Sequence, residues 1–218
     1  MPSVIEIFSP PEKNPRMIAP DILSITLMAM EAVLVVWLMV DRKHLSAFGA
    51  RKLCHAGSGI ILMLLNCEEF QVCRFFIYAV SCVSLAMNWE VFPLLPNFWF
   101  GVPRDKGITL YLVLVSVWVF LGRPLRVLAP VFLADPAGAV VGKYITGAFP
   151  RWNRKWIGQK TLAGSFAVFT VTYLTTLDNP ENPMPRLLVA WLACLGEAVG
   201  GAYDNLVIAL VVIIFSSV

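Results

Sequence analysis

The chain has 218 residues, of which 58% are hydrophobic and only 14% are charged. Soluble domains are about 45–50% apolar and about 25% charged, so the composition excludes an ordinary soluble domain, and it excludes a disordered chain for the same reason. The formal net charge of +3 is too small for the clustered basic face that binds nucleic acid. The composition therefore predicts an integral membrane protein without a nucleic-acid partner.

Residues 1–21 are polar and contain five prolines, which favours a short extramembrane arm. From residue 22 to residue 218 we expect a single transmembrane catalytic domain, because apolar runs follow one another with short polar connections. The runs cover residues 22–40, 53–65, 75–88, 108–121, 125–141, 162–177, 187–199 and 206–217. A straight span needs about 20 residues, so polar residues at the edges of the shorter runs must face protein or water. The pattern predicts an all-α, polytopic bundle with seven or eight transmembrane helices.

The distribution of cations predicts the orientation of this bundle. Alternating the loops places 41–52, 88–107 and 142–161 on one side, and these loops carry eleven of the 17 Lys and Arg residues. By the positive-inside rule, this side faces the cytoplasm, or the stroma in a plastid. The N-terminus then lies on the opposite side. An endoplasmic reticulum, plastid or bacterial inner membrane fits this multi-pass pattern equally.

Charged groups inside the apolar runs call for a structural or functional explanation, because inserting an ionised residue at the bilayer centre costs about 2.5–3.5 kcal/mol of free energy. Glu31 lies in the middle of the first run, and we expect it to be buried and hydrogen-bonded. Arg51, Lys52 and His55 crowd one side of a helical turn, since they are three and four residues apart. Arg and Lys so placed could bind phosphate. The alternative is a snorkelling pair beside an interfacial histidine.

Asp135 and Pro136 form a helix-start signal, with Asp as N-cap and Pro in the first turn. The pair lies inside an apolar run, so we expect a broken helix near Asp135 with a new helix beginning there. The positive end of such a helix suits an anion or a metal–phosphate group. The alternative is a kinked span in which Gly138 and Gly142 form a face of small residues for helix packing.

Residues 151–165 form the most basic loop and end in Lys160-Thr161 and Gly164-Ser165. A cation, two hydroxyls and a glycine that permits close backbone approach are typical of a phosphate cradle. A belt of basic and aromatic residues at the membrane interface would explain the Arg and Trp residues of the loop. It would explain the four residues at its end less simply.

Glu197 and Asp204 are two helical turns apart, and Gly200-Gly201 favours a break between them. We expect both carboxylates and Asn205 to gather at the cytoplasmic end of the last spans. Together with Asp135 they supply the oxygen ligands that Mg²⁺ prefers, opposite cations that would bind a nucleotide triphosphate. A pathway for protons or ions is the competing use of such acids.

These blocks resemble those of the CTP-dependent polyprenol kinase family, which includes phytol and farnesol kinases, dolichol kinase and the yeast-type diacylglycerol kinase. The matching blocks run in the family's order over about residues 50–210: Arg51-Lys52-x-x-His55, Asp135-Pro-Ala-Gly-Ala-x-x-Gly142-Lys143, Lys160-Thr-Leu-Ala-Gly164-Ser165, and Glu197 followed by Asp204-Asn205-Leu206. The chain departs from the family in two places. After Lys143 it keeps the family's glycine, Gly147, but not its second basic residue, and the loop before Lys160 carries extra Trp and Arg residues.

The resemblance implies an integral-membrane lipid kinase. Such an enzyme transfers the γ-phosphoryl group of CTP, with Mg²⁺, to an isoprenoid alcohol of the phytol, farnesol or dolichol type, giving the lipid monophosphate and CDP. The alcohol would enter sideways from the membrane lipid. Mg²⁺ would be held by Asp135, Glu197 and Asp204. The nucleotide would be bound by Arg51, Lys52, Gly138, Gly142, Lys143, Lys160, Thr161, Gly164, Ser165 and Asn205. Catalysis would involve Lys160 and a base that accepts the alcohol proton, with Asp135 preferred over His55.

Two other functions are compatible with the same residues. The Asp–glycine–basic segment and the Lys-Thr-x-x-Gly block distantly resemble phosphatidate cytidylyltransferases, which would make a CDP-lipid and pyrophosphate from a lipid phosphate. A small transporter with intramembrane acids, without catalysis, is the third hypothesis. The sequence leaves the oligomeric state open.

Overall fold

The computed structural model describes residues 19–176 and 183–216. These residues form two compact units, one ending at Arg126 and the other beginning at Val127, and each unit is described by itself. Most of the predicted N-terminal arm, residues 1–18, lies outside the described residues. The expectation of one catalytic domain over residues 22–218 stays a prediction.

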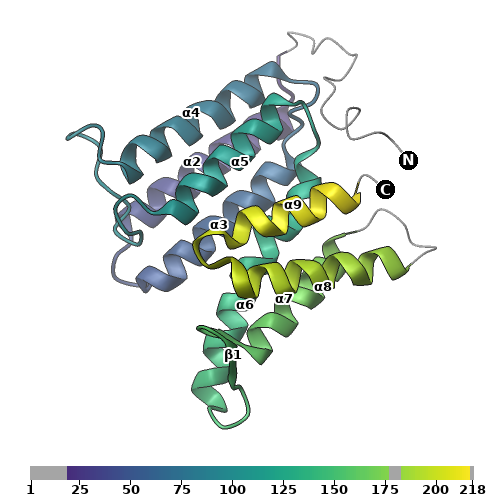
Figure 1. Cartoon of the computed structure of the whole chain (residues 1–218). Coiled ribbons are helices and arrows are strands. Elements are labelled where there is room, and N and C mark those ends of the chain that lie inside the picture. Colours follow the sequence, from purple (N-terminus) through teal and green to yellow (C-terminus); the bar gives the residue numbers. More distant parts are fainter. Residues whose placement is uncertain (1–18, 177–182, 217–218) are drawn as a thin grey trace. The chain divides into compact units, whose positions relative to one another are not determined.

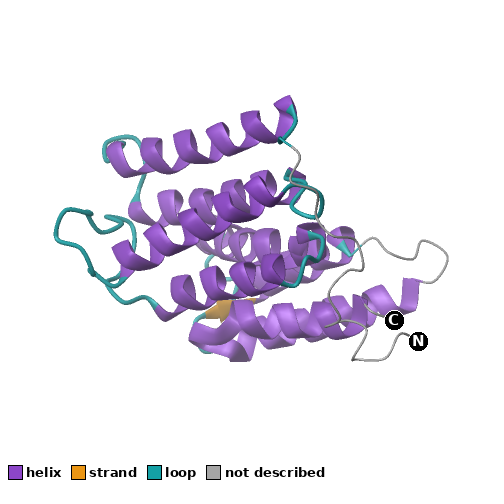
Figure 2. Ribbon diagram, turned by 90° about the horizontal axis from the view of Figure 1, so that it is seen from above, coloured by secondary structure: helices purple, strands orange, loops and turns teal. Residues whose placement is uncertain are grey.

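The described chain is mostly helical (Figure 2), and the described part of each of the eight apolar runs is almost entirely helical, as the sequence predicts. The helices are α2 (Ile22–Val40), α3 (Ala47–Leu64), α4 (Gln71–Asn88), α5 (Lys106–Phe120), α6 (Ala129–Ala148), α7 (Leu162–Thr175), α8 (Pro183–Gly200) and α9 (Asp204–Ser216). Two 3₁₀ turns, η1 (Leu125–Leu128) and η2 (Gly201–Tyr203), precede α6 and α9. The all-α class is confirmed.

Four helical stretches of the described chain are long and apolar enough to cross a membrane. They are Ile22–Val40, Gln71–Asn88, Leu125–Ala148 and Met184–Phe215, the last of which covers most of α8 and of α9. Helices α5 and α7 are apolar but shorter. Large apolar side chains such as Phe120 and Phe166 are exposed on these helices, which suits contact with lipid. The finer expectation of seven or eight spans stays a prediction.

Short polar side chains define where several helices begin. Asp21 accepts a hydrogen bond from the Ser24 N–H at the start of α2, at 2.7 Å. Ser46 accepts from the Gly49 N–H at the start of α3, at 3.1 Å. These N-caps satisfy backbone donors that have no partner within the helix. They fix the ends of apolar segments whose interiors carry no such signal.

In the N-terminal unit, α2 packs on α3 and α4, and α4 packs on α5. Leu38, Ala50 and Phe100 form a buried cluster, and the indole N–H of Trp99 donates to the Leu38 carbonyl at 2.7 Å. Glu31 is 3% exposed and hydrogen-bonds Ser58, so the expectation of a buried, hydrogen-bonded Glu31 is confirmed.

In the C-terminal unit, α6 packs against α7 and α9, while α8 packs against both α7 and α9 (Figure 1). A short antiparallel hairpin of β1 (Lys155–Ile157) and β2 (Lys160–Thr161) connects α6 to α7. Gly158 lies in the turn between the strands with φ +53°, a backbone conformation that glycine adopts without strain. The hairpin places residues of the basic loop beside α6.

The predicted break near Asp135 is wrong. Helix α6 runs without interruption from Ala129 to Ala148, with Pro136 inside it. The helix starts six residues earlier, at Ala129, where Pro130 occupies the first turn and the 3₁₀ turn η1 precedes it. Proline has no N–H and disfavours a helix interior. The buried packing of this segment, in which Val131, Phe132 and Ala134 are fully covered, outweighs that local preference.

Candidate functional site

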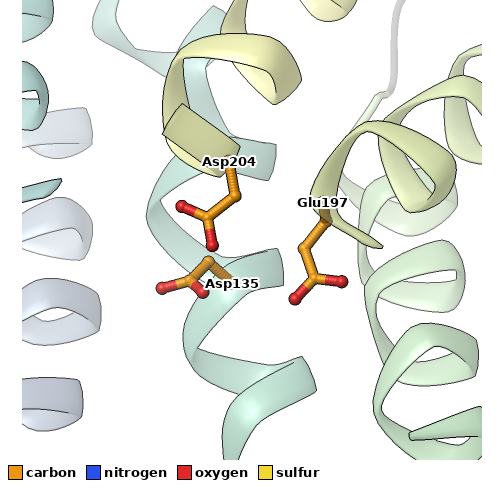
Figure 3. Close-up of side chains that lie close together, drawn as sticks. All are labelled: Asp135, Glu197 and Asp204. Carbon is orange, nitrogen blue, oxygen red and sulfur yellow. The ribbon is translucent and has the colours of Figure 1, made fainter. Parts of the chain in front are cut away.

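Three carboxylates from three helices of the C-terminal unit converge. Asp135 lies on α6, Glu197 on α8 and Asp204 at the first residue of α9 (Figure 3). One carboxylate oxygen of each lies within 4.8 Å of the others. Asp135 and Glu197 are buried at 6% and 3% exposure. Three acids so close together and so poorly solvated repel one another unless a cation joins them.

The turn between α8 and α9 brings Glu197 and Asp204 together. Helix α8 ends at Gly200, and η2 reverses the chain before α9 begins at Asp204. Gly201 has φ +57°, which favours glycine. Gly196 lies so close to α9 that a Cβ there would be 2.5 Å from Val207. The predicted break at Gly200-Gly201 is confirmed, as is the expected approach of the two acids.

The ammonium group of Lys160 lies against two of these carboxylates. It hydrogen-bonds Glu197 Oε1 and reaches Asp204 Oδ2 at 3.2 Å. Burial alone would lower the pKa of Lys160, but the hydrogen bonds and charges of Glu197 and Asp204 outweigh burial and raise this pKa above its ordinary value. The second oxygen of Glu197 is buried and has no hydrogen-bond partner in the described part of the chain. A single lysine therefore satisfies the cluster only in part.

A cavity of about 360 Å³ opens beside the cluster, within the size range of small-molecule sites. Glu197 belongs to its wall, together with three lysines: Lys143, Lys155 and Lys160. Three cations around one cavity suit an anionic ligand with several charges. Sequence reasoning assigned roles to Lys143 and Lys160, but it missed Lys155 and the neighbouring Gln159, which also line the cavity.

Gly138, Gly142 and Gly164 bring the backbones of α6 and α7 into contact. A Cβ at Gly138 would lie 2.4 Å from Val168 Cγ2, and a Cβ at Gly164 would lie 2.8 Å from the Gly138 carbonyl oxygen. A Cβ at Gly142 would lie 2.9 Å from the Thr161 hydroxyl. The alternative of a small-residue packing face is therefore observed. All three glycines also line the cavity, and their contact with a nucleotide stays a prediction.

Asn153 links the hairpin to both helices, and sequence reasoning missed it. Its side-chain amide donates to the Gly142 carbonyl at 3.1 Å and to the Thr146 hydroxyl at 2.9 Å, and its oxygen accepts from the Ala163 N–H at 2.9 Å. The residue is only 4% exposed. A lone Asn in a polar loop has no spacing or periodicity that would have identified it.

Thr161 and Ser165, predicted to bind nucleotide, line the cavity and also have local partners. Thr161 is the N-cap of α7 and accepts from the Gly164 N–H at 3.2 Å. Ser165 accepts from the indole N–H of Trp156 at 2.9 Å. This second bond fastens β1 to α7. Trp156, one residue of the predicted aromatic belt, is thus hydrogen-bonded to a residue that lines the cavity.

Arg51, Lys52 and His55 belong to α3 in the N-terminal unit, which the structure does not place relative to the acidic cluster. Arg51 forms an ion pair with Asp105 at 2.7 Å. Asp105 is the N-cap of α5, so the pair joins α3 to the start of α5. The ring of His55 meets that of Tyr111 edge-on, 4.5 Å between centroids. The predicted phosphate and proton-transfer roles of these residues stay predictions.

Asn205, the last predicted ligand of the nucleotide, is buried next to Asp204 at 9% exposure. Its backbone N–H donates to Asp204 Oδ1 at 2.8 Å, which helps to orient that carboxylate. The residue is not among those that line the cavity. Its observed contact is therefore with an acid of the cluster.

Comparisons of the chain with protein-family models, with curated proteins and with solved structures gave no significant match.

Proposed function

We propose that this chain is an integral-membrane lipid kinase that transfers the γ-phosphoryl group of CTP to an isoprenoid alcohol. One observation carries the proposal: three carboxylates converge within 4.8 Å at the edge of a cavity lined by three lysines. Carboxylate oxygens suit Mg²⁺, and lysines suit the phosphates that Mg²⁺ bridges. The motif resemblance supplies the choice of CTP and of an isoprenoid alcohol.

The donor set fits a hard divalent cation. All three candidate ligands, Asp135, Glu197 and Asp204, offer oxygen, and Glu197 keeps one buried oxygen without a hydrogen-bond partner in the described residues. When bound, Mg²⁺ would neutralise charge that develops on the phosphates. Asn205 would hold Asp204 in its present orientation through the backbone bond.

The remaining steps fall to side chains of the chain itself. Lys143, Lys155 and Lys160 would bind and orient the triphosphate, which is the main task in phosphoryl transfer. The alcohol oxygen would form a bond to the γ-phosphorus while the bond from that phosphorus to the β-phosphate oxygen breaks and CDP leaves. We assign the proton of the alcohol to Asp135, whose carboxylate lies in the cluster, as general base.

The membrane arrangement belongs to the same proposal. The four long apolar stretches support a membrane protein, and we propose that the shorter helices also cross, giving seven or eight spans. The three lysines that line the cavity belong to the segment 142–161, which the distribution of cations assigns to the same side as the other basic loops. By the positive-inside rule the cavity would open on the cytoplasmic or stromal face, where CTP is available, while the alcohol would approach from the bilayer.

Product analysis tests this proposal. Purified full-length protein in detergent is incubated with a prenol, CTP and Mg²⁺, and a parallel sample receives a lipid phosphate in place of the prenol. Release of CDP with formation of prenyl phosphate supports the kinase. In the sample with the lipid phosphate, formation of a CDP-lipid with release of pyrophosphate from CTP identifies a cytidylyltransferase instead. Both samples are repeated with ATP, GTP and UTP in place of CTP. If neither product forms in any of them, an enzymatic function is refuted and transport is the remaining hypothesis.

A substitution at the cluster sharpens the test. Asp135→Asn keeps the shape of the side chain and removes its charge, so we expect turnover to fall by at least about a thousandfold if Asp135 both binds metal and accepts the proton. Arg151→Gln, in the exposed loop outside the cavity, is the matched control and should keep normal turnover. Normal turnover in Asp135→Asn would remove Asp135 from the reaction.

A further inference from the structure

Lys160 occupies the position that a cation would take among the carboxylates. Its ammonium contacts Glu197 and Asp204 together, and its side chain is 28% exposed. The backbone of Lys160 is part of β2, so the contact depends on a flexible four-carbon side chain that reaches from the hairpin. The lysine thus joins two helices that carry like charges.

One ammonium cannot neutralise this cluster. Three ionised carboxylates carry a formal charge of −3 against +1 from Lys160, and a buried oxygen of Glu197 lacks a hydrogen-bond partner within the described residues. A divalent cation would supply twice the charge and could bind all three acids. A metal ion and the Lys160 ammonium therefore compete for the same two carboxylates, those of Glu197 and Asp204.

The alternative place for the ammonium lies in the same cavity. Lys160, Lys143 and Lys155 all line it, so Lys160 can leave the acids by a change in its side chain alone. The hairpin need not move: Trp156 is bonded to Ser165, and Asn153 is bonded to both helices. Phosphate groups in the cavity would provide the acceptors that Lys160 loses when it leaves the carboxylates.

We propose that Lys160 is an internal substitute for the metal, which makes the site selective for a metal–triphosphate complex over the free metal ion. A free ion must break the contacts of Lys160 with Glu197 and Asp204 and leave the ammonium without an anion. A metal–triphosphate complex displaces the same ammonium but offers it phosphate oxygens. This inference rests on the proposed metal site, and it adds that the metal binds as a complex with the triphosphate.

Binding of Mn²⁺ alone tests the inference, because it needs no turnover. The free Mn²⁺ signal in electron paramagnetic resonance reports binding to the full-length protein in detergent. A charge-assisted hydrogen bond corresponds to about tenfold or more in an equilibrium constant. We therefore expect Lys160→Met to bind Mn²⁺ about tenfold or more tightly than the wild type. Lys160→Gln, which also removes the charge, should show the same direction.

Lys155→Met is the matched control. It removes the same charge from the same cavity, but the Lys155 ammonium bonds Gln159 rather than an acid, so we expect wild-type affinity for Mn²⁺. Lys160→Met should also lose catalytic turnover while it gains metal affinity. Damage to the fold would lower both the turnover and the affinity for Mn²⁺. A lower turnover together with a higher affinity therefore shows that Mn²⁺ displaces the Lys160 ammonium from the carboxylates.

The outcomes separate this inference from the function on which it rests. If Lys160→Met and Lys160→Gln bind Mn²⁺ no more tightly than the wild type, and Asp135→Asn abolishes binding in all of them, the metal site stands and the substitute role of Lys160 is refuted. If no variant binds Mn²⁺ at millimolar concentration, the acidic cluster is not a metal site and both proposals fall.

Discussion

Removal of the Asn153 side chain should destabilise the C-terminal unit more than any change at the neighbouring loop surface. Asn153→Ala deletes three hydrogen bonds, to Gly142, Thr146 and Ala163. A hydrogen bond contributes about 0.5–1.5 kcal/mol net, and a buried group left without a partner costs about 1–3 kcal/mol.

The structure shows which partner is left unsatisfied. The Gly142 carbonyl still accepts from the Thr146 hydroxyl at 2.6 Å, so it keeps a donor. The Ala163 N–H, in the first turn of α7, loses the acceptor that Asn153 provides. Counting modest losses for the first two bonds and the full penalty for the third, we expect the free energy of unfolding to fall by about 2–4 kcal/mol.

Unfolding in mixed detergent micelles, followed by circular dichroism, measures this loss. Arg151→Ala is the control, because Arg151 is exposed in the same loop and exposed substitutions of this kind stay within about 0.5 kcal/mol. Asn153→Asp keeps an acceptor for Ala163 and should recover part of the loss. A loss in Asn153→Ala no larger than that in Arg151→Ala would refute the reasoning that Asn153 holds the hairpin to α6 and α7.

Two more predictions follow from the same unit. Gly138→Ala would place a methyl group 2.4 Å from Val168 Cγ2, so we expect a loss of about 1–3 kcal/mol in the same unfolding assay. Gly147→Ala, on the same helix with open space around it, should be neutral or stabilising by up to about 1 kcal/mol; equal losses in both would refute tight packing of α6 on α7. The contribution of the Lys160 ion pairs to the free energy of unfolding should be constant from pH 7 to 9 and disappear on the alkaline side of about pH 10.4. The reason is that a lysine whose pKa is raised in the folded state stabilises the fold only while its ammonium is charged. The difference in unfolding free energy between wild type and Lys160→Met, measured without metal against pH, checks this; a difference that grows with pH would contradict it.

Local signals predicted the parts of the fold that local chemistry decides. Each apolar run forms a helix, and Gly200-Gly201 ends α8 where the pattern indicated. The Asp135-Pro136 signal failed because it was judged without its surroundings. Pro130, six residues earlier, has the same preference for a first turn, and the buried contacts of α6 determine which proline starts the helix.

Contacts between residues far apart in the sequence were predicted where a buried charge needs a partner of opposite charge. They were missed where no such charge is present. Acids in or beside apolar runs require a shared cation, so the approach of Asp135, Glu197 and Asp204 could be expected from the sequence. The pairing of Arg51 with Asp105 and the three bonds of Asn153 follow no spacing rule. They arise from backbone positions that exist only once the helices have packed.

The glycine contacts between α6 and α7 have a mechanical consequence. A Cβ on Gly164 would lie 2.8 Å from the Gly138 carbonyl oxygen and 3.4 Å from the Cα of Gly142, so the two helices pack closely and cannot separate without opening a void. The two helices therefore behave as one rigid body, which keeps Asp135 in a fixed position beside the cavity. Any opening of this cavity must then come from side chains, from the hairpin or from a rotation at Gly201, where an added Cβ would meet no described atom within 4 Å.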